Sequence, residues 1–145
     1  MIKPSLIQKY NVPAPRYTSY PTVPHWNNIV NPINWGDSFT SAYQNFGAKE
    51  GISLYIHLPY CESLCTYCGC NKRITKNHKV ELPYISGLMK EWDMYTQLLG
   101  EKPKLAGIHL GGGTPTFFSP SALYTLINHI TQAATKMEDF EFSFE

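Results

Sequence analysis

Residues 52–70 read ISLYIHLPYCESLCTYCGC, and this stretch decides the fold that we expect. Its first half alternates between apolar and polar side chains, a pattern that is typical of a β-strand with one buried face. The apolar face carries Ile52, Leu54, Ile56 and Leu58, and the polar face carries Ser53, Tyr55 and His57. The strand runs directly into a loop that holds all four cysteines of the chain. We therefore predict a strand whose carboxyl end opens into a loop with a chemical role.

Two further strands are expected downstream, each separated from the previous one by a helix. Residues 105–110 form the second strand, which leads into Gly-Gly-Gly-Thr-Pro-Thr at 111–116, and residues 140–144 form the third. This order of strands and helices is typical of an α/β fold with a parallel sheet or barrel. In such folds functional groups gather where strands end and helices begin. The cysteine loop and the glycine run both fall at that edge.

The two helices between these strands are predicted from apolar side chains that recur at helical spacing. The first helix has Pro83 in its first turn and Gly100 at its stop. The second begins after the cap residue Ser119, with Pro120 at its first position.

The N-terminal part differs from the rest because residues 1–35 are rich in proline, which breaks regular elements. We expect an irregular arm from Tyr10 to Trp26, followed by a short helix from Trp35 to Phe46 with Asn34 as its cap. The sequence thus suggests an N-terminal arm and short helix over residues 1–50 and a core over residues 51–145. The third strand ends at the last residue of the chain, so we expect the core to be truncated there.

Bulk properties exclude several classes of protein. The chain has 145 residues and a net charge of +1, so nothing in its charge suggests binding to nucleic acid or to a membrane surface. Its start lacks the apolar core of a signal peptide, and no stretch reaches the roughly 18 apolar residues of a membrane span. The cytoplasm is the expected location, where clustered cysteines favour metal binding over disulfides.

Cys61, Cys65 and Cys68 have the spacing C-x3-C-x2-C. Three thiolates on one loop can hold three irons of a cubane cluster and leave the fourth iron open to a small molecule. The alternative is a structural zinc site, in which His57 or His78 would be an additional ligand. No second C-x2-C pair is present to complete such a site, which favours iron. Cys70 is either a bystander thiol or a group near the reaction that exchanges a proton or hydrogen atom.

Three other places are candidates, each with a plain structural alternative. The run Gly111–Gly113 lets the backbone approach a ligand, or is simply a tight turn. Glu145 is a possible partner for a ligand's ammonium or hydroxyl groups, or a solvated strand end. Tyr55 offers a ring or hydroxyl to a ligand near the open iron, and His57 is either catalytic or an ordinary histidine with satisfied hydrogen bonds.

Taken together, Tyr55-Ile-His57, the cysteine spacing and Gly-Gly-Gly-Thr-Pro-Thr resemble the radical S-adenosylmethionine enzymes. Within that superfamily, Cys70, the segment Gln8-Lys9-Tyr10-Asn11 and the segment from Pro15 to Thr22 resemble the oxygen-independent coproporphyrinogen III oxidase family. The resemblance extends from residue 6 to residue 145. It implies a partial (β/α)6 barrel of the TIM type, of which this chain would hold the first half, followed by a helical domain.

The resemblance also implies cofactors and site residues. Cys61, Cys65 and Cys68 would hold a [4Fe–4S] cluster, and two molecules of S-adenosylmethionine would bind per chain. Tyr55, Gly112 and Glu145 would contact the first molecule, and Tyr67, Gly113 and Thr114 would contact the second. Tyr55, His57 and Cys70 are the candidates for catalytic roles. Arg16 is a candidate partner for carboxylates of the substrate.

The implied reaction belongs to haem biosynthesis. A 5′-deoxyadenosyl radical would abstract hydrogen from two propionates of coproporphyrinogen III, and decarboxylation to vinyl groups would give protoporphyrinogen IX. The reaction needs an electron donor and an electron acceptor, whose identities the sequence does not give. We expect the full-length protein to be a monomer and this part alone to be inactive. A haem chaperone of the same superfamily and a zinc-stabilised binding module are the alternatives.

Overall fold

The structure, a computed structural model, describes residues 4–11, 25 and 31–145. Arg16, and with it most of the predicted arm, lies outside these residues. The chain divides into two compact units, Met1–Pro32 and Ile33–Glu145. In the first unit, helix α1 spans Pro4–Tyr10, which the proline content did not predict. The second unit holds the sheet and the cysteine loop, and the domain boundary after residue 50 stays a prediction.

A three-stranded parallel sheet forms the centre of the second unit, as the alternating elements predicted. Its strands are β1 (Ile52–Leu58), β4 (Lys104–Gly112) and β5 (Thr135–Phe144), in the order β1-β4-β5. Strand β4 extends beyond the predicted residue 110 because Gly111 and Gly112 pair with His57 and Leu58. Strand β5 begins at Thr135, earlier than the predicted residue 140.

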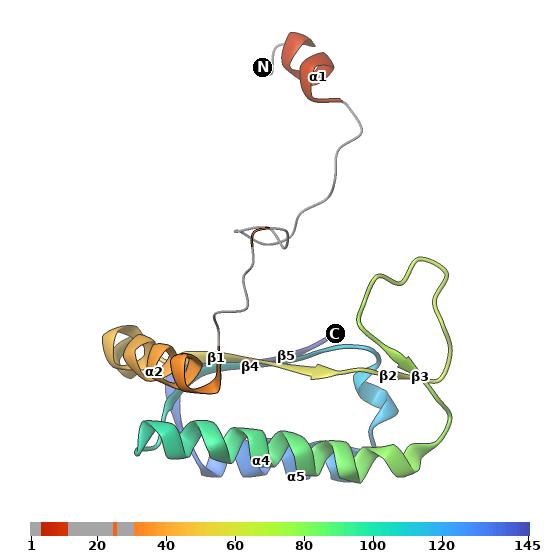
Figure 1. The fold of residues 1–145 in the computed structure, drawn as a ribbon. Coiled ribbons are helices and arrows are strands. Elements are labelled where there is room, and N and C mark those ends of the chain that lie inside the picture. Colours follow the sequence, from red (N-terminus) through yellow and green to blue (C-terminus); the bar gives the residue numbers. More distant parts are fainter. Residues whose placement is uncertain (1–3, 12–24, 26–30) are drawn as a thin grey trace. The chain divides into compact units, whose positions relative to one another are not determined.

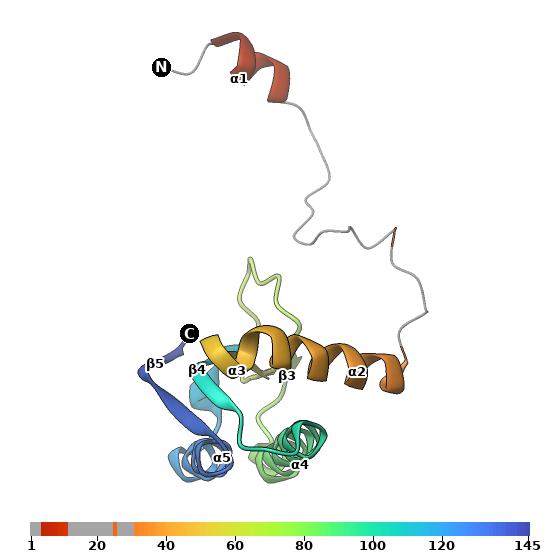
Figure 2. The same cartoon turned by 90° about the vertical axis from the view of Figure 1, so that its left-hand side faces the viewer.

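Two helices cover one face of the sheet (Figures 1 and 2). Helix α4 (Glu81–Leu99) connects β1 to β4, and helix α5 (Pro120–Gln132) connects β4 to β5. In these two helices, the predicted stop at Gly100 and the predicted cap at Ser119 are confirmed. Gly100 ends α4 with a left-handed φ of 68°, and the Ser119 hydroxyl accepts a hydrogen bond from the Ala122 amide at 3.3 Å.

The helical segment before β1 is longer than the predicted helix from Trp35 to Phe46. It consists of α2 (Pro32–Ala42), a π-helical stretch (Tyr43–Gly47) and α3 (Ala48–Glu50). The prediction of a helix here is confirmed, but its cap is wrong. The helix begins at Pro32, so Asn34 lies within its first turn. Proline is favoured at the first helical position because it has no amide hydrogen to leave unpaired.

The core lies between the sheet and the two helices. The side chains that are almost completely buried come from the helix-facing side of β1 and β4, from α5 and from the adjoining loops; they are Phe118, Leu58, Leu105, Ile108, Leu110, Leu126 and Pro103. The alternation in β1 therefore has the predicted consequence: Ile56 and Leu58 are buried, and Tyr55 on the opposite face is 60% exposed.

Short elements frame the cysteine loop. A two-residue strand β2 (Tyr60–Cys61) pairs in parallel with β3 (Arg73–Ile74), and these pairs close the loop at its base. Short 3-10 helices cover His78–Val80 and Pro115–Phe117. Within the described residues, no helix combines the length and the apolar character needed to cross a membrane.

Candidate functional site

Polar side chains gather on the sheet face that α4 and α5 leave open. The parallel register places Tyr55 beside His109, and His109 beside Ser143. The rings of Tyr55 and His109 stack with centroids 5.7 Å apart, and His109 Nδ1 lies 2.8 Å from the Ser143 hydroxyl. Each strand thus contributes one member to a row of polar groups across the sheet.

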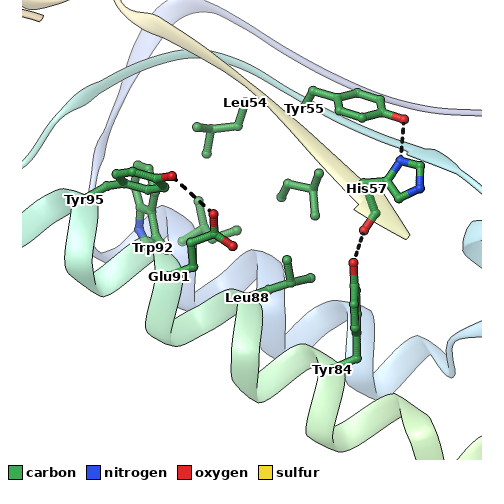
Figure 3. A pocket seen from close by; sticks show the side chains of 10 residues that line it. Leu54, Tyr55, His57, Tyr84, Leu88, Glu91, Trp92 and Tyr95 are labelled. Carbon is green, nitrogen blue, oxygen red and sulfur yellow. Dashed lines mark hydrogen bonds between the residues drawn. The ribbon is translucent and has the colours of Figure 1, made fainter. Parts of the chain in front are cut away.

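The orientation of His57 is fixed by two hydrogen bonds. Its Nε2 lies 2.6 Å from the Asn71 carbonyl oxygen, and its Nδ1 lies 3.1 Å from the Tyr55 hydroxyl. A carbonyl oxygen only accepts, so Nε2 carries a proton, and in the neutral imidazole Nδ1 accepts from Tyr55. Figure 3 shows this pair above β1, with the Tyr84 hydroxyl donating to the His57 carbonyl from α4 at 2.7 Å. His57 thereby connects β1 to the far end of the cysteine loop.

The glycine run fits closely against the end of β1. The Gly113 amide donates to the Leu58 carbonyl at 2.8 Å, and a Cβ on Gly113 would lie 2.7 Å from the backbone carbon of Pro59. Gly112 has a φ of 113°, and a Cβ there would lie 2.5 Å from the His57 ring. Side chains at these positions would therefore displace β1 or fill the space in front of His57.

A cavity of about 390 Å³ opens at this place, which we call the strand-end cavity. Most of the predicted ligand and catalytic residues line it. Its lining consists of Tyr55, His57, Cys70, Asn71, His109, Gly111, Gly112, Gly113 and Glu145. Residues that are distant in sequence meet here because parallel strands end at the same edge of a sheet.

The cysteine loop lies next to this cavity, and all four of its thiols are free. Cys61 and Cys68 are half-buried, whereas Cys65 and Cys70 are exposed. The Thr114 hydroxyl lies 3.4 Å from the Cys61 sulfur, and the Cys68 amide donates to the Cys65 carbonyl at 3.2 Å. The loop therefore has a defined path at its base and a turn between its second and third cysteines.

These residues fit an iron–sulfur cluster by the chemistry of their donors. In the part of the chain that the structure describes, no three Cys, His, Asp or Glu side chains converge as the ligands of a single metal ion would. A cubane cluster instead binds its thiolates through different irons, so the thiolates need not meet at one point. Three free thiols on one accessible loop meet that requirement.

The two histidines considered as additional zinc ligands are both engaged elsewhere. His57 contacts Tyr55 and Asn71, and His78 contacts Glu62 and Glu81 through its two ring nitrogens. Neither offers a free nitrogen to a metal without breaking one of these hydrogen bonds.

Cys70 has a distinctive electrostatic environment. The pKa of its thiol is raised, mainly by the electrostatic interaction with the neighbouring Cys68 and by a hydrogen bond between the two side chains. Glu145 raises this pKa further, and Lys72 opposes the increase. Cys70 therefore interacts directly with Cys68 while lining the strand-end cavity.

Two of the predicted cofactor contacts lie away from this cavity. Tyr67 is 93% exposed on the cysteine loop. Thr114 lines a different cavity of about 300 Å³, together with Glu62, Ser63, Cys65, Thr116 and Phe117. Of the three contacts predicted for the second molecule, Gly113 alone lines the strand-end cavity.

The sequence interpretation missed Asn71 and His109. His109 could have been found, because it alternates with buried Ile108 and Leu110 as Tyr55 and His57 alternate with their apolar neighbours. Asn71 gave no signal, since it contributes through its backbone carbonyl.

Comparisons with known proteins agree with the resemblance. No protein-family model matches the chain. The chain is 38% identical to an oxygen-independent coproporphyrinogen III oxidase of Mannheimia haemolytica over 97% of this chain and 92% of that protein. It is 35% identical to the Pseudomonas aeruginosa protein of the same name, over 92% of this chain but 28% of that protein.

A solved structure is also similar. It is coproporphyrinogen III oxidase (HemN) from Escherichia coli, a radical SAM enzyme, with a TM-score of 0.77 and 28% identity over 97% of this chain. The chain spans 30% of that structure and a similar share of most curated relatives. With the relative from Mannheimia haemolytica matched over nearly its whole length, the chain belongs to the oxygen-independent coproporphyrinogen III oxidase family.

Proposed function

We propose that this chain supplies the cluster-binding part of an enzyme that decarboxylates two propionates of coproporphyrinogen III to vinyl groups, giving protoporphyrinogen IX without oxygen. The observation that carries the proposal is the free cysteine loop beside the strand-end cavity, in a chain of this family. When bound, a [4Fe–4S] cluster and S-adenosylmethionine supply the radical chemistry that removes a hydrogen atom from each propionate. An electron acceptor takes up the electron that remains after carbon dioxide leaves.

Cys61, Cys65 and Cys68 would hold the cluster. The pairing of β2 with β3 supports this role, because it holds the two ends of the loop together and so limits its conformations. The amide of Arg73 donates to the Pro59 carbonyl at 2.7 Å, and that of Thr75 to the Cys61 carbonyl at 2.9 Å. A loop fixed at its base loses less conformational freedom when it binds a cofactor.

The strand-end cavity would take S-adenosylmethionine, with Tyr55, Gly112 and Glu145 as its contacts. The Glu145 carboxylate is suited to the ammonium group of this molecule, and the Gly112 backbone allows a close approach. Tyr55 presents its exposed ring while its hydroxyl contacts Nδ1 of His57, whose tautomer is set by the Asn71 carbonyl at Nε2. His57 then acts by orienting Tyr55 and Asn71.

A second S-adenosylmethionine would contact Tyr67, Gly113 and Thr114. Thr114 lines a separate cavity next to Cys65, while the adjacent Gly113 lines the strand-end cavity, which supports a second place directly beside the first molecule. Arg16 would pair with carboxylates of the substrate. Cys70, at the border between the cysteine loop and the strand-end cavity, is a candidate for proton or hydrogen exchange.

The remaining strands of a six-stranded partial barrel would complete the site. Strand β5 is at the edge of the sheet, and Phe144 on its helix-facing side is 63% exposed. Strand β5 pairs with β4 on one side only, and an open strand edge with exposed apolar side chains favours a covering element. We therefore expect this chain to be inactive without the rest of the barrel.

The test is anaerobic reconstitution of the full-length protein with iron and sulfide, followed by measurement of carbon dioxide release from coproporphyrinogen III. Release should require S-adenosylmethionine and a reductant. Substituting Cys65→Ser should abolish iron loading and turnover. The matched variant Cys70→Ser should keep its iron, because Cys70 is not proposed as a ligand.

Other outcomes would point to the alternatives. Stoichiometric transfer of haem to an acceptor without carbon dioxide release would indicate a haem chaperone. One zinc per chain after anaerobic purification, with no uptake of iron, would indicate a zinc-stabilised module.

A further inference from the structure

His78 stands at the centre of a contact cluster that joins the cysteine loop to the helices. Its Nδ1 lies 2.6 Å from a carboxylate oxygen of Glu81, and its Nε2 lies 3.1 Å from a carboxylate oxygen of Glu62. Its ring stacks on Phe117 with centroids 4.3 Å apart and planes 12° apart. Contacts on both edges and on one face of the ring fix its orientation.

The Glu81 end of this cluster is firmly anchored. Glu81 is the first residue of α4 and is only 7% exposed. Its second carboxylate oxygen accepts the Ser119 amide at 2.8 Å, at the cap of α5. This hydrogen bond, together with His78, lowers the pKa of Glu81, so the carboxylate is charged and ties together the start of both helices.

The Glu62 end is part of the cysteine loop. Glu62 directly follows Cys61, and its side chain is more than half exposed. An exposed ion pair contributes little to the stability of a fold. The contact joins Glu62 to His78, which lies 16 positions further along the chain. It therefore ties the start of the cysteine loop, next to Cys61, to the segment that precedes α4. The same loop segment borders the cavity that holds Cys65.

We propose that His78 is a positioning residue for the cysteine loop. It holds Glu62 with one nitrogen and the anchored Glu81 with the other, and so restrains the segment between Cys61 and Cys65 against the start of α4 and α5. The relevance of this restraint to cluster assembly rests on the proposed function, but the restraint itself is a property of the metal-free loop.

The test measures how fast each thiol of the metal-free, reduced full-length protein reacts with iodoacetamide, a neutral reagent, with cysteines resolved by mass spectrometry. The variants are His78→Gln, Glu62→Gln and the double variant. The control is His129→Gln, because His129 pairs with Asp93 at 2.7 Å between α4 and α5, away from the loop.

His78→Gln and Glu62→Gln should each accelerate alkylation of Cys61 and Cys65 about two- to fivefold, as expected when one exposed ion pair is lost. The double variant should react no faster than either single variant, because both remove the same contact. The His129→Gln control should react like the unmodified protein.

Charge effects alone predict a different result. Removing a cation at position 78 would raise the pKa of nearby thiols, and removing an anion at position 62 would lower it, so the two variants would then change the rates in opposite directions. Opposite changes, or a Glu62→Gln variant that reacts at the original rate, would overturn the proposal. If Glu62→Gln has no effect while His78→Gln does, His78 acts only through its contact with Glu81 at the start of α4.

Iron uptake by the same variants separates this inference from the proposed function. Should the unmodified protein take up no iron, the proposed function fails while the thiol rates still decide the role of His78. Should it load iron normally but show unchanged thiol rates in every variant, the role of His78 fails and the proposed function stands.

Discussion

The two faces of the sheet arise from alternate residues of the same strands, yet they serve different purposes. On the helix-facing side, Leu58, Ile108 and Leu110 are almost completely buried. On the open side, Tyr55 and His109 remain accessible and are ordered by ring stacking and hydrogen bonds. Stability is therefore concentrated on one face and the candidate chemistry on the other, so substitutions should separate the two properties.

The largest effect on stability is expected on the helix-facing side. Leu58→Ala should reduce the free energy of unfolding by about 2–5 kcal/mol, because it leaves a cavity in a fully buried position. Ser53→Ala, on the open face of the same strand, should change it by less than about 0.5 kcal/mol. Native-state hydrogen exchange of the β1 and β4 amides measures both. Equal losses in the two variants would contradict the division between the faces.

A smaller loss is expected at Gly112, where the open face has no room for a side chain. Gly112→Ala combines a left-handed φ of 113° with a Cβ only 2.5 Å from the His57 ring, and should cost about 1–3 kcal/mol. It should also displace His57 from Asn71. The chemical shift of the His57 ring protons and the denaturation midpoint report these two effects.

Gly100→Ala provides the matched control for backbone strain. Gly100 also has a positive φ, of 68°, but a Cβ there would meet no atom within 4 Å. The loss in Gly112→Ala beyond that in Gly100→Ala measures the clash with His57. Adding His57→Ala should recover part of that excess; an unchanged excess would show that the ring is not the obstacle.

The parts of the fold that could be predicted are those that depend on neighbouring residues, and the parts that were missed depend on contacts between distant ones. The alternation in β1, the helix stop at Gly100 and the helix cap at Ser119 could be predicted because each depends only on residues a few positions apart in the sequence. The end of β4 was missed because Gly111 and Gly112 carry no side-chain pattern and become a strand only by pairing with β1. The pairing of β2 with β3 is likewise a contact between distant residues.

The candidate site shows the same limit. Tyr55, His57, Cys70 and Glu145 could be assigned to one edge because the carboxyl ends of parallel strands meet there. His78 was considered only as a zinc ligand. Its contacts with Glu62 and Glu81 depend on how α4 approaches the cysteine loop, which no local pattern in the sequence specifies.

A third prediction concerns the contacts between the cysteine loop and the helices, and it depends on pH. Hydrogen bonds to Glu81 and Glu62 raise the pKa of His78 above 6.5, so its stabilising effect is complete below that pH and is lost as pH rises through the raised value. The lowered pKa of Glu81 makes its contribution complete above about pH 4.5 and removes it as pH falls through the lowered value.

The contacts of His78 with Glu62 and Glu81 should therefore stabilise the protein most between about pH 4.5 and 6.5. The measurement is the thermal midpoint of the unmodified protein minus that of His78→Gln, followed across pH. This difference should be greatest in that window and smaller on both sides. A difference that increases steadily toward alkaline pH would contradict the assignment of a charged His78.

The smallest effect on stability is expected for Tyr55→Phe, which leaves the ring stacked on His109 and removes only the hydroxyl. Because Tyr55 is 60% exposed, the free energy of unfolding should change by less than about 0.5 kcal/mol. His57 Nδ1 then loses its hydrogen-bond donor, and only the hydrogen bond from Nε2 to the Asn71 carbonyl still orients the ring. If the strand-end cavity takes S-adenosylmethionine, its affinity should fall while stability stays constant, as isothermal titration of the reconstituted protein can measure. Tyr124→Phe, on the exposed side of α5, should change neither quantity, and an equal loss of affinity in both variants would show that the open face of β1 has no special part in binding.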